Sequence, residues 1–253
     1  MDLSAIILTH NNRTTIRQCL KGLAFCDEII IVDDFSQDET LDIVKKFKIT
    51  FSKTLKLYQR LLESDFASQR NFGLAKATST WILFLDADET VTKELRLEIL
   101  KSLQDKNIKG FYIKRQDKFL GKILKYGETS NVYLLRLAQK NSGVWLSPVH
   151  EIWDIKPQTK YLKASLIHHR DLSVNQFLNR INWYSELAAQ SLYQKKIKES
   201  SLRLFLNPIG KFFYNYLIRQ GFRDGFPGLI MAYLMSWHSF LVRIRLRLLW
   251  LNK

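Results

Sequence analysis

The sequence has few cysteines, and the two that it has cannot build a disulfide framework. Cys19 and Cys26 are the only cysteines among 253 residues, and neither lies in a C-x-x-C spacing that would indicate a zinc site. Such sparing use of cysteine is typical of a reducing compartment.

Acidic residues are few compared with basic ones. The chain has 24 Asp and Glu and 39 Lys and Arg, which gives a formal net charge of +15. This charge favours a polyanionic partner such as nucleic acid, anionic lipid or a phosphorylated substrate.

The N-terminal residues lack a basic segment followed by an apolar stretch and a small-residue cleavage site. They do not resemble a signal peptide, so we expect the protein on the cytoplasmic side of the membrane. The composition, 46% hydrophobic and 25% charged, is that of an ordinary globular protein. It excludes disordered, collagen-like and disulfide-stapled chains.

The first 115 residues alternate between short apolar runs and segments with helical periodicity. The runs predict strands at 3–9, 28–32 and 81–85. The periodic segments predict helices at 13–25, 38–47, 66–77 and 93–103. This alternation predicts an α/β fold with a mostly parallel sheet covered by helices on both faces.

Polar and acidic residues follow the predicted strands. The first strand runs into THNN (9–12), the second into DDFS (33–36) and the strand at 81–85 into DADE (86–89). Ligands of parallel sheets bind at the carboxyl ends of the strands, so we expect these residues to converge on one edge. Short strands follow from 110 to 144 and lead into SPVHE (147–151), and the chain is helical in pattern and rich in aromatics from 173 onward.

The positive charge is concentrated at the C-terminal end. Residues 189–253 contain 11 Lys and Arg against 2 Asp and Glu. Within them, residues 225–242 carry no charged side chain, and Arg223 and Arg243 flank them. We expect this segment to lie in the interface of an anionic membrane. A membrane-spanning segment, or a helix packed on the preceding domain, are the alternatives.

These motifs together resemble the family 2 glycosyltransferases of GT-A fold, and among them the subgroup that adds sugars to lipopolysaccharide core or related lipid-linked glycans. The resemblance rests on LSAIILTHNN, CDEIIIVDDFSQDET, ASQRNFGLAKATSTWILFLDADE, PVHE, the segment around His168 and PIGKFFYNYLIRQGFRDGFPGL, and so covers nearly the whole chain. The sequence departs from the family at Phe35, where a small residue is usual, and at Ser79 and Thr80, which replace a common Gly-Asp/Glu.

The change to a helical, aromatic-rich pattern after residue 172, taken with the resemblance, predicts two regions. Residues 1–172 would form the catalytic domain, with a nucleotide-sugar-binding half at 1–110 and an acceptor-side half at 110–172. Residues 173–253 would form a helical, basic, aromatic-rich extension that associates peripherally with the inner face of the cytoplasmic membrane.

The resemblance also implies an inverting transferase that uses a nucleoside-diphosphate sugar, most simply a UDP-sugar. The diphosphate leaving group gains negative charge during transfer, and Mg²⁺ or Mn²⁺ held by carboxylates stabilises such charge. In Asp86-Ala87-Asp88, Asp88 would ligate the metal directly, and Asp86 would reach the ribose, or the metal through water. His168 would be a further metal ligand. The alternatives are that the acidic residues begin the next helix and that His168 is structural.

For the nucleotide, the resemblance implies that Asp33 or Asp34, more specifically Asp34, accepts a hydrogen bond from the base. Thr9 and Asn11 would line the same pocket. Arg70 would face the diphosphate, and a surface-exposed helical arginine is the alternative reading.

For the acceptor, inversion requires one base that takes the proton of the attacking hydroxyl group. The resemblance assigns this role to Glu151, with His150 positioning the acceptor or the base. The alternative is an exposed His-Glu pair with no catalytic role.

Two other classes remain open. A sugar nucleotidyltransferase would need a glycine-rich phosphate loop after the first strand, where this sequence has THNNRTT. A non-catalytic basic protein could bind membrane or nucleic acid, but the sequence carries no recognisable nucleic-acid-binding motif, and its acidic cluster would repel phosphates without metal. The expected partners are therefore a nucleotide-sugar donor, a glycan or glycolipid acceptor and an anionic membrane surface, with no nucleic acid.

Overall fold

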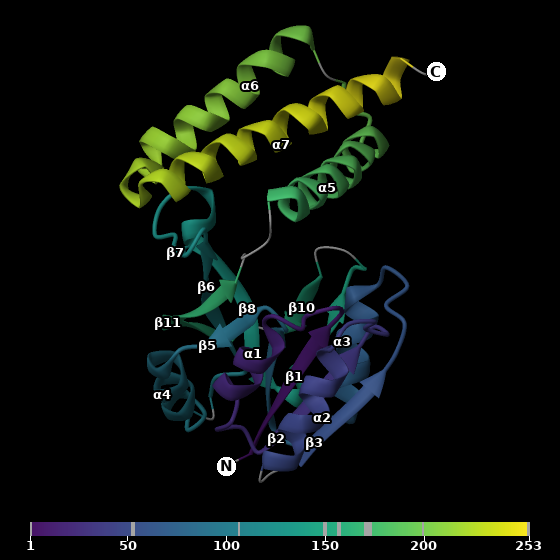
Figure 1. Ribbon diagram of the computed structural model, residues 1–253, viewed down its shortest axis with the longest axis vertical. Helices are drawn as coiled ribbons and strands as arrows, with labels where there is room; N and C mark the ends of the chain where they lie inside the picture. The colour runs from purple at the N-terminus through teal and green to yellow at the C-terminus, as the bar shows by residue number, and fades with distance from the viewer. Residues whose placement is uncertain are drawn as a thin grey trace. The chain divides into compact units, whose positions relative to one another are not determined.

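The computed structural model describes residues 2–51, 54–105, 107–148, 151–155, 158–169, 174–198 and 200–251 (Figure 1). The chain divides into two compact units, Met1–Gln116 with Val132–His169, and Asp117–Asn131 with Arg170–Lys253. Residues 117–131, which the sequence analysis places in the catalytic domain, therefore group with the C-terminal helices.

One half of the central sheet of the first unit is parallel. Its strands, in the order β3-β2-β1-β4, are β1 (Leu3–Thr9), β2 (Glu28–Asp33), β3 (Thr54–Gln59) and β4 (Trp81–Asp86). All six residues of β2 are buried, as expected for a strand with helices on both sides. The strands predicted at 3–9, 28–32 and 81–85 are confirmed, and β3 adds a strand that the sequence analysis did not locate.

The other half of the sheet is mainly antiparallel. It continues from β4 in the order β8-β6-β11-β5, with β8 (Val132–Gln139), β6 (Gly110–Phe119), β11 (Thr159–His169) and β5 (Glu89–Val91). The pairs β4–β8, β6–β8 and β11–β5 are antiparallel. A separate antiparallel hairpin joins β9 (Gly143–Leu146) and β10 (Ile152–Ile155).

Helices cover the sheet on both faces. The helices of this unit are α1 (Ile16–Gly22), α2 (Thr40–Thr50), α3 (Phe66–Lys76) and α4 (Lys93–Ser102). Buried residues of α1, α2 and α4 share one core with Ala5 and Ile7 of β1, whereas α3 packs with Ile6 on the opposite face. The helices predicted at 66–77 and 93–103 are confirmed almost residue for residue, because both begin at a capping side chain. Asp65 accepts a hydrogen bond from Ser68 N at 2.8 Å, and Thr92 accepts one from Leu95 N at 3.1 Å.

Three aromatic rings connect the α3 face of the sheet to the β9–β10 hairpin. Trp153 contacts the edge of Phe84 at 4.9 Å between ring centroids and stacks on Trp145 at 5.3 Å. Only 2% of the Trp153 surface is exposed.

We expect Trp153→Ala to lower the free energy of unfolding by about 3–5 kcal/mol, because it removes a buried ring and leaves a cavity. Urea denaturation followed by circular dichroism measures the change. Trp183→Ala is the matched control, since Trp183 lies on a helix surface with 45% of its area exposed. Equal losses in the two variants would contradict the packing role of Trp153.

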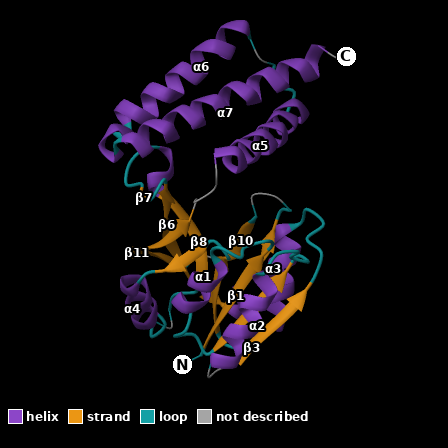
Figure 2. Ribbon diagram, viewed as in Figure 1, coloured by secondary structure: helices purple, strands orange, loops and turns teal. Residues whose placement is uncertain are grey.

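The second unit is built from helices that lie side by side (Figure 2). They are α5 (Val174–Gln194), α6 (Ser201–Phe213), a π-helical turn η3 (Tyr214–Ile218), a 3₁₀ turn η4 (Gly221–Asp224) and α7 (Phe226–Leu251). Phe119 and Leu124, which flank the short strand β7 (Lys122–Ile123), pack with Phe177, Met231 and Leu234. This contact explains why residues 117–131 join this unit. Among the described helices, none has the length and apolar composition needed to cross a bilayer.

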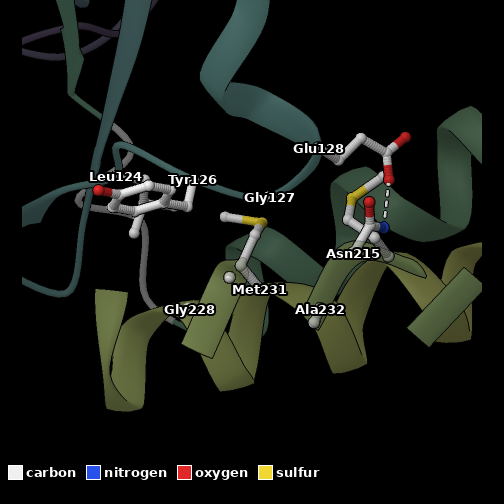
Figure 3. A pocket seen from close by; sticks show the side chains of 10 residues that line it. Leu124, Tyr126, Gly127, Glu128, Asn215, Gly228, Met231 and Ala232 are labelled. Carbon is white, nitrogen blue, oxygen red and sulfur yellow. Dashed lines mark hydrogen bonds between the residues drawn. The ribbon is translucent and has the colours of Figure 1, made fainter. Parts of the chain in front are cut away.

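Figure 3 shows a small cavity of the second unit, between α7 and the segment that contains Leu124 and Glu128. Asn215 Nδ2 donates a hydrogen bond to Glu128 Oε2 at 2.9 Å beside it. The volume of the cavity is about 10 Å³, the lower limit for a single water molecule. It is therefore too small to hold a nucleotide or a sugar.

Candidate active site

The carboxyl ends of three parallel strands meet at one edge of the sheet. Thr9 at the end of β1 pairs with Asp33 of β2, and Leu8 pairs with Asp86 of β4. The convergence predicted from the sequence is confirmed.

Asp86 binds two buried arginines. Its Oδ1 accepts a hydrogen bond from Arg70 Nη2 at 2.8 Å, and its Oδ2 accepts one from Arg136 Nη2 at 2.7 Å. The side chains of Arg70 and Arg136 are 2% and 5% exposed. Burial would raise the pKa of Asp86, but the positive charges of Arg136 and Arg70 outweigh it and hold this pKa well below its usual range. Asp86 is therefore ionised, and each of its carboxylate oxygens accepts a hydrogen bond from a guanidinium group.

Arg70 also binds Glu151, the candidate base. Arg70 Nε and Nη2 donate to Glu151 Oε1 at 3.0 and 2.9 Å. The guanidinium group lies over the ring of Trp145, 4.8 Å from its centroid, which fixes its orientation. One arginine on α3 thus connects the carboxylate at the end of β4 with a carboxylate next to the β9–β10 hairpin. His150 lies outside the described residues.

Glu89 completes the charge cluster. It is fully buried, its Oε2 accepts a hydrogen bond from Asp86 N at 3.1 Å, and its Oε1 lies 3.4 Å from Arg136 Nη2. Burial, together with the negative charge of Asp86, raises the pKa of Glu89 despite the charge of Arg136. The sequence predicts no role for Glu89. For Arg136 it leaves two roles open, contact with phosphate or stabilisation of the sheet, and the structure pairs this arginine with Asp86 and Glu89. The available signal was a charged residue within the apolar strand VYLLRL, because a buried arginine requires a carboxylate partner.

Asp88, in the turn between β4 and β5, forms a pair with His168 of β11. Asp88 Oδ2 lies 3.3 Å from His168 Nε2, and the backbone of β11 holds this register because His169 N donates to Asp88 O at 2.8 Å. The second histidine is used elsewhere, since His169 Nε2 lies 3.0 Å from Thr90 Oγ1. The structure therefore brings His168, the residue named from the sequence, to Asp88.

A carboxylate oxygen and an imidazole nitrogen are suitable ligands for Mn²⁺, so this pair fits a divalent cation. Within the described residues, no group of three or more His, Cys, Asp or Glu side chains is arranged to hold a metal ion. The remaining ligands would have to be substrate or water oxygens. The expected role of Asp86 is contact with the ribose, or with the metal through water, and in this structure each of its oxygens accepts a hydrogen bond from an arginine.

The two adjacent acids at the end of β2 have different surroundings. Asp33 is fully buried, and its Oδ1 and Oδ2 accept hydrogen bonds from Ser36 Oγ and Ser36 N at 2.5 and 3.0 Å. Asp34 is 23% exposed; its Oδ1 accepts from Leu62 N at 3.0 Å, whereas its Oδ2 lies 3.6 Å from His10 Nδ1. Asp34 can therefore reach a ligand, and Asp33 instead holds the loop.

The loop residues near Asp34 keep an unusual backbone. Asn11 and Phe35 have φ angles of +52° and +47°, a left-handed conformation that favours glycine or asparagine. Phe35 adopts this conformation although it is neither glycine nor asparagine, at the position where a small residue is usual in the family. Thr9 is buried. Ala87, which the sequence analysis expects beside the nucleotide sugar, is buried as well, and its N–H donates to Leu8 O at 3.1 Å.

A half-parallel sheet with charged side chains gathered at its carboxyl edge agrees with the GT-A fold that the sequence resembles. A family model described as glycosyl transferase family 2 matches residues 4–187. The chain belongs to this family, and the resemblance seen in the sequence is confirmed.

Curated relatives span almost the whole chain. The lipopolysaccharide core biosynthesis glycosyltransferase LpsC of Rhizobium meliloti is 28% identical over 257 residues, covering 97% of this chain and 92% of LpsC. An uncharacterized glycosyltransferase of Rickettsia conorii is 26% identical over 262 residues, covering 97% and 89%. Both support the assignment as a glycosyltransferase.

Solved structures share the fold. The S. aureus TarS fragment 1–349 in complex with UDP-GlcNAc has a TM-score of 0.53 and 16% identity, covering 100% of this chain and 92% of that chain. The mannosyltransferase PcManGT of Pyrobaculum calidifontis, in complex with GDP-Man and Mn²⁺, has a TM-score of 0.58 and 12% identity, covering 100% and 88%.

Proposed function

We propose that this glycosyltransferase moves a sugar, with inversion at the anomeric carbon, from a UDP-sugar to a lipid-linked or lipopolysaccharide-type glycan. The observation that carries the proposal is Arg70, which binds both Asp86 at the sheet edge and Glu151. The name of LpsC supports the acceptor class, and the complex of TarS with UDP-GlcNAc supports the donor.

On the donor side, Asp34, Thr9 and Asn11 receive the nucleotide base, and Asp34 Oδ2 is the acceptor for its hydrogen bond. Asp88 and His168 would hold Mn²⁺ or Mg²⁺, which when bound supplies positive charge for the diphosphate leaving group. The arginines add fixed positive charge. Arg70 Nη1 and the Nε and Nη1 of Arg136 are buried without a hydrogen-bond partner in the described part of the chain. This surplus of donors favours a site that stabilises an anion.

On the acceptor side, Glu151 takes the proton of the attacking hydroxyl group. The acceptor oxygen forms a bond to the anomeric carbon on the face opposite the diphosphate, and the bond between that carbon and the diphosphate oxygen breaks. Both hydrogen bonds of Arg70 go to Oε1 of Glu151, so Oε2 is the oxygen that receives the proton. Arg70 positions the base, and His150 is the adjacent candidate for orienting the acceptor.

We also propose that the chain associates peripherally with the anionic inner face of the cytoplasmic membrane. The support is the charge of residues 189–253, with 11 Lys and Arg against 2 Asp and Glu. Such an excess attracts anionic headgroups.

The test is nucleotide release from UDP-, GDP-, TDP- and CMP-linked sugars in the presence of Mn²⁺, Mg²⁺ or EDTA. We expect release of UDP from one UDP-sugar, dependent on the cation and abolished by EDTA. Release from a GDP-sugar alone would overturn the donor assignment. No release and no saturable binding of any donor would favour a non-catalytic basic membrane-binding protein.

A further inference from the structure

Helix α6 turns its apolar side chains outward. Leu202, Phe205, Leu206, Ile209 and Phe213 recur at three- and four-residue spacing, and each has more than half of its surface exposed. In the π-helical turn that follows, Leu217 and Ile218 are 51% and 71% exposed. We call these seven residues the apolar strip. Contiguous exposed apolar surface of this kind marks an interaction site.

The opposite face of α6 makes the internal contact. Pro208 is buried, and its carbonyl oxygen accepts a hydrogen bond from Ser236 Oγ of α7 at 2.7 Å. Helix α6 therefore packs on α7 partly through this face. Of the apolar strip, Phe205 also meets α7, where its ring centroid lies 6.5 Å from that of Phe240.

Exposed cations lie at both ends of the apolar strip. Lys195, Lys196 and Lys198 precede α6, and Arg219 and Arg223 follow the π-helical turn. Residues 200–223 contain no Asp or Glu. An apolar face flanked by cations, without acidic residues between them, is the pattern of a segment that lies in the headgroup region of an anionic bilayer.

A groove beside α6 carries further cations. Its volume is about 530 Å³, and Lys211, Tyr214 and Arg219 are among its lining residues. Lys211 Nζ lies 3.0 Å from Glu128 Oε1, and Arg219 Nη1 donates to Glu128 O at 3.3 Å. The carboxylate and the carbonyl oxygen of Glu128 thus position Lys211 and Arg219 at the groove, where their charged groups can contact headgroup phosphates.

We propose that the apolar strip of α6 is the membrane-docking surface of this protein, with its apolar side chains at the acyl boundary and the flanking cations on the phosphates of anionic lipids. The inference rests on the membrane association proposed above and names the surface responsible. The membrane contact then lies on α6 and not at residues 225–242, where the sequence analysis expects it, because Met231, Ala232 and Leu234 of α7 are buried within the unit.

The charges also argue against a second copy as the occupant. A two-fold interface places the same patch on both partners. Two apolar strips paired in parallel or antiparallel would bring cationic ends together. Residues 200–223 contain no acidic residue, and the carboxylate of Glu128 at the groove is already paired with Lys211. An anionic bilayer removes this repulsion.

Co-sedimentation of the full chain with phosphatidylcholine vesicles, with and without phosphatidylglycerol, tests the proposal. We expect binding to the anionic vesicles and a loss of at least about tenfold in their affinity for Phe205→Ser combined with Ile209→Ser. Lys195→Gln combined with Lys196→Gln should cause a similar loss, with an unchanged thermal unfolding midpoint. The matched control is Ile49→Ser with Leu97→Ser, which removes exposed apolar side chains of the first unit.

Nucleotide release from a soluble donor is measured on the same variants and should be unchanged, so failure of docking is distinguishable from failure of the proposed activity. The proposal is overturned if wild type does not bind anionic vesicles, or if the control variant loses as much affinity. A wild-type dimer that Phe205→Ser with Ile209→Ser dissociates, without vesicle binding, would overturn it in favour of a second copy.

Discussion

Asp88→Asn is expected to lower metal-dependent nucleotide release at least about 100-fold while leaving the free energy of unfolding nearly unchanged. Asp88 pairs with His168 at 3.3 Å, and its side chain lies in a partly exposed position. The amide has the shape of the carboxylate but lacks its charge, so affinity for Mn²⁺ should fall without loss of packing. Titration of Mn²⁺ by electron paramagnetic resonance, alongside steady-state release of nucleotide, measures both quantities.

Asp86→Asn provides the contrast. It leaves Arg70 and Arg136 buried without their carboxylate, and breaking a buried ion pair in this way costs about 3 kcal/mol or more. We therefore expect Asp86→Asn to destabilise the chain measurably and Asp88→Asn not to do so. Asp42→Asn, at an exposed position of α2, is the control for the chemical change.

Equal stability losses for Asp86→Asn and Asp88→Asn would show that the two carboxylates do not divide their roles in this way. A wild-type affinity for Mn²⁺ in Asp88→Asn would remove Asp88 from the proposed metal pair.

The parallel half of the sheet was predictable because its local signals agree with its final environment. EIIIV and WILFL are apolar on both faces, as strands covered on both sides must be. Asp65 and Thr92 cap the helices that precede and follow WILFL along the chain. The strand β3 was missed because it lies next to β2 at the end of the sheet order and only Leu55 is fully buried in it.

The arginine cluster was less predictable, since it depends on contacts between distant parts of the sequence. Arg70 meets Glu151 across 81 residues, and Arg136 meets Asp86 across 50. The sequence indicated which acids converge at the sheet edge, but their assignment to metal, loop or arginine follows from side-chain partners. The adjacent acids Asp33 and Asp34 differ in burial and in hydrogen-bond partners, which their positions in the sequence do not show.

The grouping of residues 117–131 with the helical unit depends on equally distant contacts. Asp224 Oδ2 accepts hydrogen bonds from Lys125 N and Tyr126 N at 3.0 and 2.8 Å, from a position about 100 residues further along the chain. A buried carboxylate that satisfies two backbone N–H groups fixes this segment. The boundary inferred from periodicity could not include such a contact.

Glu151→Gln is expected to reduce the rate of sugar transfer at saturating donor by about 10²–10⁴-fold, with little change in donor affinity. The amide oxygen can still accept the two hydrogen bonds of Arg70, so the side chain stays in place, but it cannot take the acceptor proton. Measuring the rate constant for transfer and the donor dissociation constant separately distinguishes loss of the base from loss of binding. Glu94→Gln, on the exposed surface of α4, controls for the substitution.

Arg70→Lys separates the positioning of the base from the base itself. Lysine keeps the positive charge but cannot donate from two nitrogens to Glu151 and bind Asp86 in the same planar arrangement. We expect this variant to weaken donor binding as well as transfer, whereas Glu151→Gln affects transfer alone.

His150→Gln tests whether the residue next to Glu151 takes the proton. If His150→Gln abolished transfer and Glu151→Gln retained it, the proton acceptor would be the histidine, and the contact of Arg70 with Glu151 would serve only to hold the β9–β10 hairpin.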